Sequence, residues 1–192
     1  MRKGSIALET YVWDVRKFVH NLASYPHINQ IIDGYRQNQL IALPTETVYG
    51  LGANAKDEEA IKNIYKAKGR PSDNPLIVHI HNKNQLKDFT ENISEETELL
   101  MDAFWPGPIS FIVPYKSGYL DDRVTGGLNS VAVRMPSHAI GREILQLVNL
   151  PIAAPSANLS GRPSPTKFEH VKHDLNTRIY GIIQAEDIDE GI

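Results

Sequence analysis

The side chains best suited to chemistry begin with two cations beside glycine and proline. Lys68 and Arg70 stand at the end of a predicted helix, separated by Gly69 and followed by Pro71. Cations at a helix C-terminus are favoured by the helix dipole, so a purely structural role is one interpretation. The stiff backbone around Arg70 also favours a fixed guanidinium, which can hold carboxylate or phosphate oxygens with paired hydrogen bonds. The pattern therefore leaves both interpretations open.

Two segments share the order of apolar run, proline and short polar side chains. Residues 40–43 precede Pro44 and the polar cluster 45–47, and residues 151–155 precede Ser156 and Asn158. Proline cannot donate to a strand ladder, so each strand should end there. Ligands of α/β proteins bind at the carboxyl ends of strands. Each segment alone is typical of an ordinary polar turn, but together they could converge with the Lys-x-Arg pair on one anionic ligand.

A third cation and several histidines also need an interpretation. Arg134 ends an apolar strand and must be paired if it is buried, either in a structural ion pair or as a ligand anchor. His79 and His81 would share a strand face, and His170 and His173 would share a helix face. Neither pair has an obvious third metal ligand. We therefore predict no metal site and interpret His79 as a hydrogen-bonding pocket residue.

Residues 50–55 fit the dinucleotide-binding fingerprint G-x-G-x-x-G/A. The next helix begins near Asp57, after the glycines, and the next strand ends in Ile80-His81 rather than in an acidic residue. These departures argue against a Rossmann dinucleotide site. We expect the glycine segment to be a loop that bends closely around a ligand.

Composition restricts the class of protein. The chain has 192 residues, 41% hydrophobic and 22% charged, with a net charge of −3 and no cysteine. Globular composition of this kind supports a folded core, and the net charge argues against a generally basic nucleic-acid binder. Without cysteine there is no disulfide, thiol nucleophile or thiolate metal site. No segment approaches the roughly 20 apolar residues of a membrane span, so we expect a cytoplasmic protein.

Periodicity predicts alternating helices and strands. Expected helices cover 27–39, 57–68, one or two within 82–105, and 139–148, and expected strands cover 10–15, 40–43, 76–80, 110–115, 130–135, 151–155 and 177–184. Alternation of this kind predicts an α/β domain. The turn at Gly126-Gly127 predicts a hairpin, so the sheet should be mixed.

Taken together, these motifs closely resemble the YrdC-like family of threonylcarbamoyl-adenylate synthases. The resemblance is carried by Pro44-Thr45-Glu46-Thr47-Val48-Tyr49-Gly50-Leu51-Gly52, by Lys68 and Arg70 with Asn74-Pro75-Leu76, by Trp105-Pro106-Gly107-Pro108, by Val131-Ala132-Val133-Arg134-Met135-Pro136, and by Ser156 with Asn158. They occur in family order over roughly residues 40–165, a specific combination. The resemblance implies a single YrdC-like domain over 1–192, with 1–26 as a lead-in, an open twisted mixed α/β sheet and a large cavity.

The resemblance also implies a reaction and its residues. L-threonine, bicarbonate and ATP, with Mg²⁺ accompanying the nucleotide, would give threonylcarbamoyl-AMP and pyrophosphate for N6-threonylcarbamoylation of adenosine 37 in tRNA, with tRNA and downstream tRNA-modification proteins as possible partners. Threonine would be held by Thr47, His79, Arg134 and the Ala154 backbone. ATP would be held by Arg70, Asn74, Ser130, Ser156 and Ser164. The catalytic tetrad would be Lys68, Arg70, Ser156 and Asn158, with Ser156 a hydrogen-bond donor rather than a nucleophile.

The chain departs from the family pattern in two places. Ser110 replaces the usual threonine after the Trp-Pro-Gly-Pro motif and keeps the hydroxyl. The family continues into a Ser-Thr segment and an Arg-Pro-Gly strand about where this chain reaches Ile192, so the C-terminal end of the domain is expected to be missing. The alternatives are an RNA-binding module of the same fold and a carbamoyl-adenylate-forming domain like those of hydrogenase maturation.

Overall fold

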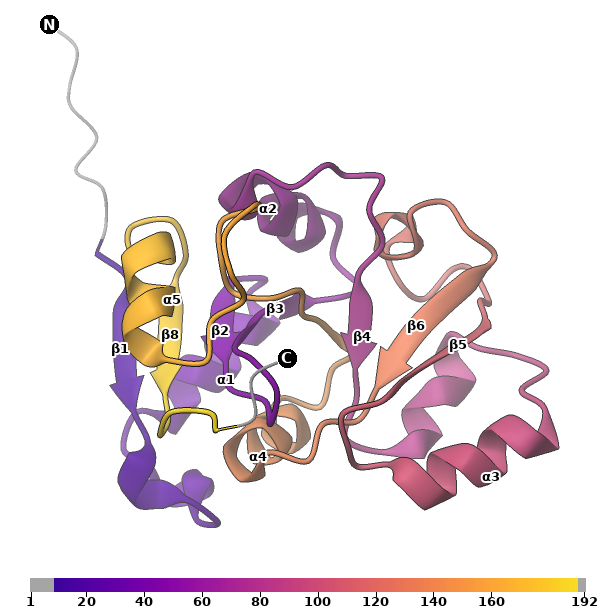
Figure 1. The fold of residues 1–192 in the computed structure, drawn as a ribbon, viewed down its shortest axis with the longest axis horizontal. Helices are drawn as coiled ribbons and strands as arrows, with labels where there is room; N and C mark the ends of the chain where they lie inside the picture. The colour runs from indigo at the N-terminus through magenta and orange to yellow at the C-terminus, as the bar shows by residue number, and fades with distance from the viewer. Residues whose placement is uncertain (1–8, 190–192) are drawn as a thin grey trace, which may run out of the picture.

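The computed structural model describes residues 9–189, which form one sheet with helices packed on it (Figure 1). The sheet has 8 strands in the order β1-β8-β2-β3-β7-β4-β6-β5. The strands are β1 (Tyr11–Asp14), β2 (Ile41–Leu43), β3 (Gly50–Asn54), β4 (Ile77–His79), β5 (Ser110–Pro114), β6 (Ser130–Arg134), β7 (Ile152–Ala153) and β8 (Gly181–Gln184). β1 and β2 pair parallel to β8, and β4 pairs parallel to β6, whereas β5 and β6 form an antiparallel hairpin. The predicted mixed sheet is confirmed.

The helix predicted to begin after Asp57 and to end before Gly69 is observed with both of its predicted ends. The helices are α1 (Ile28–Arg36), α2 (Glu58–Lys68), α3 (Glu95–Phe104), α4 (Ala139–Val148) and α5 (Phe168–Leu175), with short 3-10 turns at Arg16–Phe18, Leu22–Ser24, Lys83–Asp88 and Asp122–Thr125. Asp57 caps α2 by accepting a hydrogen bond from Ala60 N at 2.8 Å, and Gly69 ends it with φ of 62°. Within residues 9–189, no helix combines the length and apolarity needed to span a membrane.

The expectation of a loop at the glycines is wrong, although Gly50 itself lines a pocket. Gly50–Asn54 is strand β3, which pairs antiparallel with β2. A Cβ on Gly52 would lie 2.9 Å from Leu43 Cδ2 and 3.0 Å from the Tyr35 hydroxyl. The missing side chain therefore permits close packing inside the sheet. Because the glycines lie within a strand and do not lead into a helix, the motif lacks the geometry of a dinucleotide site.

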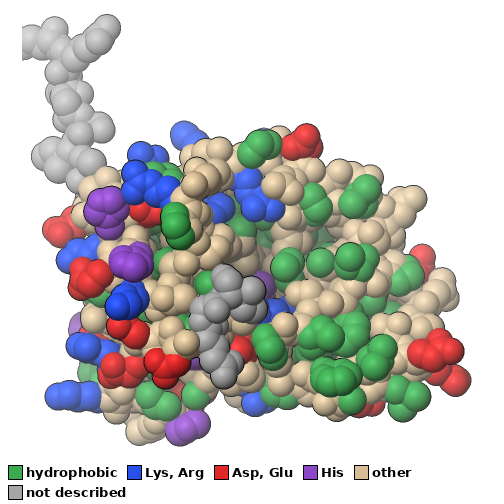
Figure 2. Space-filling view, in the orientation of Figure 1, with side chains coloured by type: hydrophobic (Ala, Val, Ile, Leu, Met, Phe, Trp, Pro, Cys, Tyr) green, Lys and Arg blue, Asp and Glu red, His purple; other side chains and the backbone are tan. Residues whose placement is uncertain are grey.

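The two faces of the sheet are covered unequally. One face of the central strands packs against α1 and α4, through residues such as Ile41, Ile144 and Ile152. The opposite face packs against α2 and α5 in a second core that extends under β4, β5 and β6. The face that α1 and α4 cover on the central strands is largely open on β4, β5 and β6. Its side chains there include Ile77, which is 37% exposed, and Ile112, which is 75% exposed. Figure 2 shows hydrophobic side chains gathered over this half of the molecule.

Candidate functional site

A pocket of about 250 Å³ opens on the sheet face that α4 leaves uncovered. We call residues 44–48, after β2, the 44–48 turn, and residues 154–158, after β7, the 154–158 turn. The lining comes from both turns, from the segment after α2, from the start of β3 and from β4 and β6. It consists of Thr45, Val48, Gly50, Arg70, Pro75, Leu76, Ile77, His79, Arg134, Ala154, Pro155 and Ser156. The predicted convergence of two strand ends is therefore observed. The enclosed volume is smaller than the large cavity expected, because the face over β4, β5 and β6 is open.

Arg134 lies on the wall of this pocket, at the end of β6. Its Nη1 donates to Thr47 Oγ1 at 3.1 Å and its Nε to Gly107 O at 3.3 Å, while Nη2 forms an ion pair with Glu46. The side chain is 11% exposed. Burial lowers the pKa of Arg134 to about 10, and the neighbouring carboxylate acts in the opposite direction. The guanidinium is therefore charged at neutral pH.

Arg70 enters the pocket from the segment that follows α2. Its Nη2 donates to Pro75 O at 2.9 Å, while its Nε is buried and has no hydrogen-bond partner in the part of the chain that the structure describes. Because a buried donor without a partner is unfavourable, this atom identifies a position where a ligand oxygen would fit.

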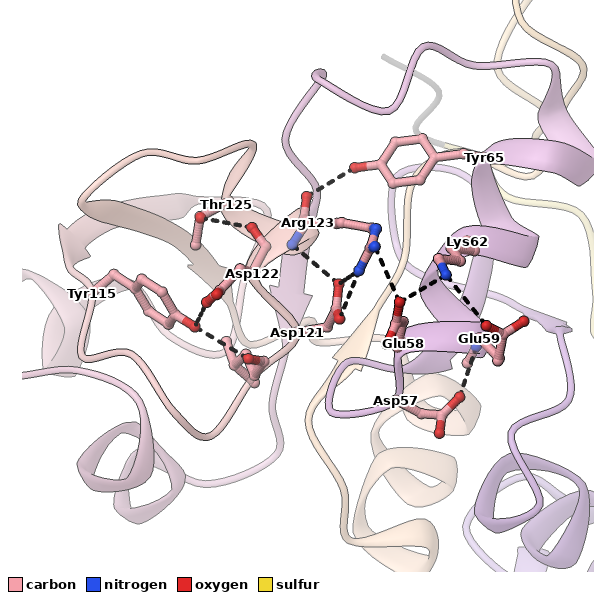
Figure 3. Close-up of polar contacts among 12 residues, drawn as sticks. Asp57, Glu58, Glu59, Lys62, Tyr65, Tyr115, Asp121, Asp122, Arg123 and Thr125 are labelled. Atoms are coloured by element: carbon pink, nitrogen blue, oxygen red, sulfur yellow. Dashed lines mark hydrogen bonds and ion pairs between the residues drawn. The ribbon is translucent and has the colours of Figure 1, made fainter.

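Polar contacts between α2 and the 3-10 turn at Asp122–Thr125 stabilise the segment that carries Arg70. The Tyr65 hydroxyl lies 2.8 Å from Asn74 O and 3.1 Å from Arg123 O, so both carbonyls share this donor. Arg123 also pairs with Asp121 and with Glu58 in the first turn of α2 (Figure 3). These contacts fix the backbone at one side of the pocket.

Lys68 is buried, and its side chain points at the 154–158 turn rather than into the pocket. Its Nζ donates to Asn158 O at 2.8 Å and also to Ser156 O. Burial, and then the nearby charge of Arg70, lowers the pKa of Lys68 to about 8. The ammonium therefore supports the turn that presents Ser156, and only two of the three predicted cations, Arg70 and Arg134, line the pocket.

His79 lines the pocket as a neutral side chain. It is 3% exposed, and burial lowers its pKa to about 4. Its Nδ1 lies 3.1 Å from Ile77 O, and because a carbonyl only accepts, Nδ1 carries the proton and Nε2 is an acceptor. His81 Nε2 instead lies 2.7 Å from Asn149 Oδ1. Within residues 9–189 no group of three or more His, Cys, Asp or Glu could hold a metal ion.

Several predicted site residues lie beside the pocket rather than on its lining. Thr47 is buried and accepts from Arg134 Nη1. Asn158 donates to Leu159 O and Arg162 O at 2.9 Å each. Three predicted ATP-binding residues lie outside the lining: Asn74 and Ser164, which are exposed, and Ser130, which is partly exposed at the start of β6.

Sequence reasoning assigned no role to Glu46, the partner of Arg134. No spacing rule relates an acid after β2 to an arginine at the end of β6. A buried Arg134 must be paired with an acid. That requirement could have identified an acidic residue in one of the neighbouring motifs as its partner.

The fold and the site together define an α/β protein with a pocket at strand ends that two arginines line. A family model for Sua5, YciO and YrdC, described as telomere recombination, matches residues 34–192. The chain belongs to this Sua5/YciO/YrdC family.

Curated relatives carry the name threonylcarbamoyl-AMP synthase. The protein from Bacillus subtilis is 56% identical over 160 residues, which is 83% of this chain and 46% of that protein. The one from Pyrococcus abyssi is 52% identical, over 82% of this chain and 46% of that protein. The chain thus spans about half the length of these relatives. A relative from Aliivibrio fischeri is 35% identical over 83% of this chain and 87% of its own.

Solved structures show the same fold. Sua5 of P. abyssi complexed with L-threonine superimposes with a TM-score of 0.85 and 46% identity, covering 93% of this chain and 51% of that one. YciO of Escherichia coli, with a TM-score of 0.77 and 20% identity over 93% of this chain and 84% of that one, shows likeness of fold alone.

Proposed function

We propose that this chain catalyses ATP-dependent synthesis of threonylcarbamoyl-AMP from L-threonine and bicarbonate, with release of pyrophosphate. The observation that carries the proposal is the presence of two arginines, Arg70 and Arg134, on one pocket reached by two strand ends. An amino-acid carboxylate and a nucleotide phosphate are both anions and need such cations. Identities of 56% and 52% with relatives named threonylcarbamoyl-AMP synthase support this choice of substrates.

Threonine would bind between Arg134 and His79. The Arg134 guanidinium would hold the carboxylate, and His79 Nε2, an acceptor at neutral pH, would accept from the amine. Ala154, which also lines the pocket, would contribute its backbone. Thr47 does not line the pocket and would contact threonine next to Arg134, to which it is hydrogen-bonded. The solved complex of P. abyssi Sua5 with L-threonine supports an amino-acid site in this fold.

ATP would bind with its phosphates at Arg70 and Ser156. The unpartnered Nε of Arg70 would meet a phosphate oxygen, and the Ser156 hydroxyl would donate to another. A volume of about 250 Å³ is below the usual range for small-molecule sites, so the nucleoside would extend across the open face of β4, β5 and β6. The partly exposed Ser130 and the exposed Asn74 would contact it there, whereas the exposed Ser164 would contact ATP from the segment that pairs with Tyr49.

The substrate supplies the nucleophile, so the chain needs no attacking Ser or Cys. The threonine amine, as the free base, forms a C–N bond with the bicarbonate carbon. A C–OH bond of bicarbonate breaks, and the hydroxyl leaves as water with one amine proton to give a carbamate. A carbamate oxygen then attacks the α-phosphorus, and the bond to the bridging oxygen breaks to release pyrophosphate. Arg70 would compensate the charge that develops on the phosphates, and the 154–158 turn, fixed by Lys68, would hold Ser156 in position.

Mg²⁺ would arrive with the nucleotide. Among the described residues, the lining contains neither aspartate nor glutamate, the usual protein ligands of this ion. The ion would therefore be held by phosphate oxygens and water. The product would serve N6-threonylcarbamoylation of adenosine 37 in tRNA through downstream modification proteins.

Pyrophosphate release by this chain tests the proposal. Release that requires ATP, L-threonine and bicarbonate together is the expected result. Release supported by carbamoyl phosphate in place of threonine and bicarbonate would identify the carbamoyl-adenylate class instead. If no pyrophosphate is released and the chain binds RNA with an affinity that falls steeply with salt, the chain is an RNA-binding module rather than a synthase.

A further inference from the structure

Glu46 joins two segments that are far apart in the chain. One carboxylate oxygen pairs with Arg134 Nη2, and the other accepts from both the backbone N and the hydroxyl of Ser137. Its side chain is 16% exposed, and Glu46 does not line the pocket, whereas Arg134 does. The carboxylate therefore pairs with the guanidinium without itself lining the pocket.

The packing of α4 explains why Ser137 reaches Glu46. Gly141, in the first turn of α4, lies so close to the 44–48 turn that a Cβ there would be 2.4 Å from Pro44 O. This approach brings the start of α4, and Ser137 before it, against the turn that carries Glu46. Ser137 holds the second carboxylate oxygen independently of Arg134, so the position of Glu46 does not depend on the arginine alone.

The other contacts of Arg134 leave a defined part of its guanidinium free. Nε donates to Gly107 O, Nη1 to Thr47 Oγ1, and Nη2 pairs with Glu46. Each terminal nitrogen carries two N–H groups, so one N–H on Nη1 and one on Nη2 remain for a ligand. Two N–H groups match the two oxygens of a carboxylate.

From this geometry we propose that Glu46 is a positioning residue, which orients Arg134 to receive the carboxylate of the amino-acid substrate. Arginine has a long side chain whose free rotation opposes ligand binding. Glu46, anchored through Ser137, removes that freedom before the ligand arrives. The identity of the ligand, an amino-acid carboxylate, rests on the proposed function. The ordering of the Arg134 side chain by Glu46 does not, because it is a property of the ligand-free chain.

Glu46→Gln tests the proposal with little change in size. Ser137 N–H needs an acceptor, so the glutamine oxygen would face Ser137. The NH₂ group would then face Arg134, a donor against a donor and without a negative charge. We expect the KM for threonine to rise about 10-fold, with the KM for ATP unchanged and kcat within about 3-fold. Glu46→Asp, which keeps the charge on a shorter side chain, should recover part of the loss. Glu169→Gln, the same change at an exposed position of α5, should leave all constants unchanged.

NMR of arginine side chains in the free chain gives a readout independent of activity. The Nε–H signal of Arg134, assigned with Arg134→Lys, should be slow to exchange in the unaltered chain and broadened in Glu46→Gln. If the chain shows no threonine-dependent reaction, the proposed function fails, while this signal still tests Glu46. An unchanged signal, an unchanged KM for threonine, or a KM that falls because Glu46 competes with the substrate carboxylate would overturn the positioning role.

Discussion

The 44–48 turn and the 154–158 turn reach the same pocket, but they are stabilised in different ways. The 44–48 turn is closed by its own side chains, since Thr45 Oγ1 donates to Val48 O at 2.6 Å and accepts from Val48 N at 3.2 Å. A hydroxyl that bonds nearby backbone groups defines a turn locally. The contacts of Glu46 then attach this closed turn to β6 and α4.

The 154–158 turn is held by groups outside it. Ala157 N donates to Tyr49 O at 2.8 Å, and the buried Lys68 ammonium donates to Asn158 O at 2.8 Å. The comparison teaches that one motif, strand then proline then polar residues, can be closed by its own side chains or can depend on a distant cation. It also separates Lys68, which supports a turn, from Arg70, which faces the pocket.

Replacing Lys68 should have the largest effect, because it removes the external support. In Lys68→Met the buried carbonyls of Ser156 and Asn158 lose their donor, and we expect the free energy of unfolding to fall by about 4 kcal/mol. Turnover should fall at least about 100-fold as the turn moves. Urea denaturation and pyrophosphate release measure both effects. Lys66→Met, at an exposed position of the same helix, is the matched control, and equal behaviour of the two variants would remove the supporting role.

Arg70→Ala should separate function from stability. We expect turnover to fall at least about 100-fold, because charge compensation of the phosphates is lost. The free energy of unfolding should change by less than about 1 kcal/mol, since Arg70 contributes one hydrogen bond to Pro75 O. Near-normal turnover would exclude Arg70 from the site, and Arg178→Ala, at an exposed position, controls for loss of a surface cation.

Acid should loosen the side of the pocket that carries the 154–158 turn. His79 pairs in register with Ile152 of β7, and burial lowers its pKa to about 4 from 6.5. Between these values the unfolded chain binds more protons, so stability is full above pH 6.5 and falls toward pH 4, by about 3 kcal/mol. Denaturation over this range should show that loss in the unaltered chain. If His79→Gln loses as much stability over this pH range as the unaltered chain, other titrating groups cause the loss.

Thr45→Val should have the smallest effect, confined to the 44–48 turn. The isosteric change removes the hydroxyl that closes the turn, and we expect the free energy of unfolding to fall by about 1 kcal/mol. Amide hydrogen exchange should quicken at Val48 and stay unchanged at Ala157. Faster exchange at both positions would show that the two turns are coupled rather than independent.

The sequence predicted the mixed sheet and the position of most helices because apolar periodicity and capping residues are local signals. It misassigned Gly50–Asn54, since glycines that permit packing against Leu43 and Tyr35 look the same as glycines in a binding loop. The clustering of Arg70, His79, Arg134 and Ser156 followed from placing each motif at a strand or helix end. Which of Lys68 and Arg70 faces the pocket depends on side-chain direction, which spacing does not determine.

The most direct test of the central claim, that Arg70 and Arg134 serve one pocket for two anionic substrates, is a crystal structure of this chain with L-threonine and a non-hydrolysable ATP analogue. The predicted result is a threonine carboxylate within hydrogen-bonding distance of Arg134 and a phosphate oxygen within the same reach of Arg70. Binding of either ligand away from these guanidinium groups, or of only one ligand at a time, would contradict the account.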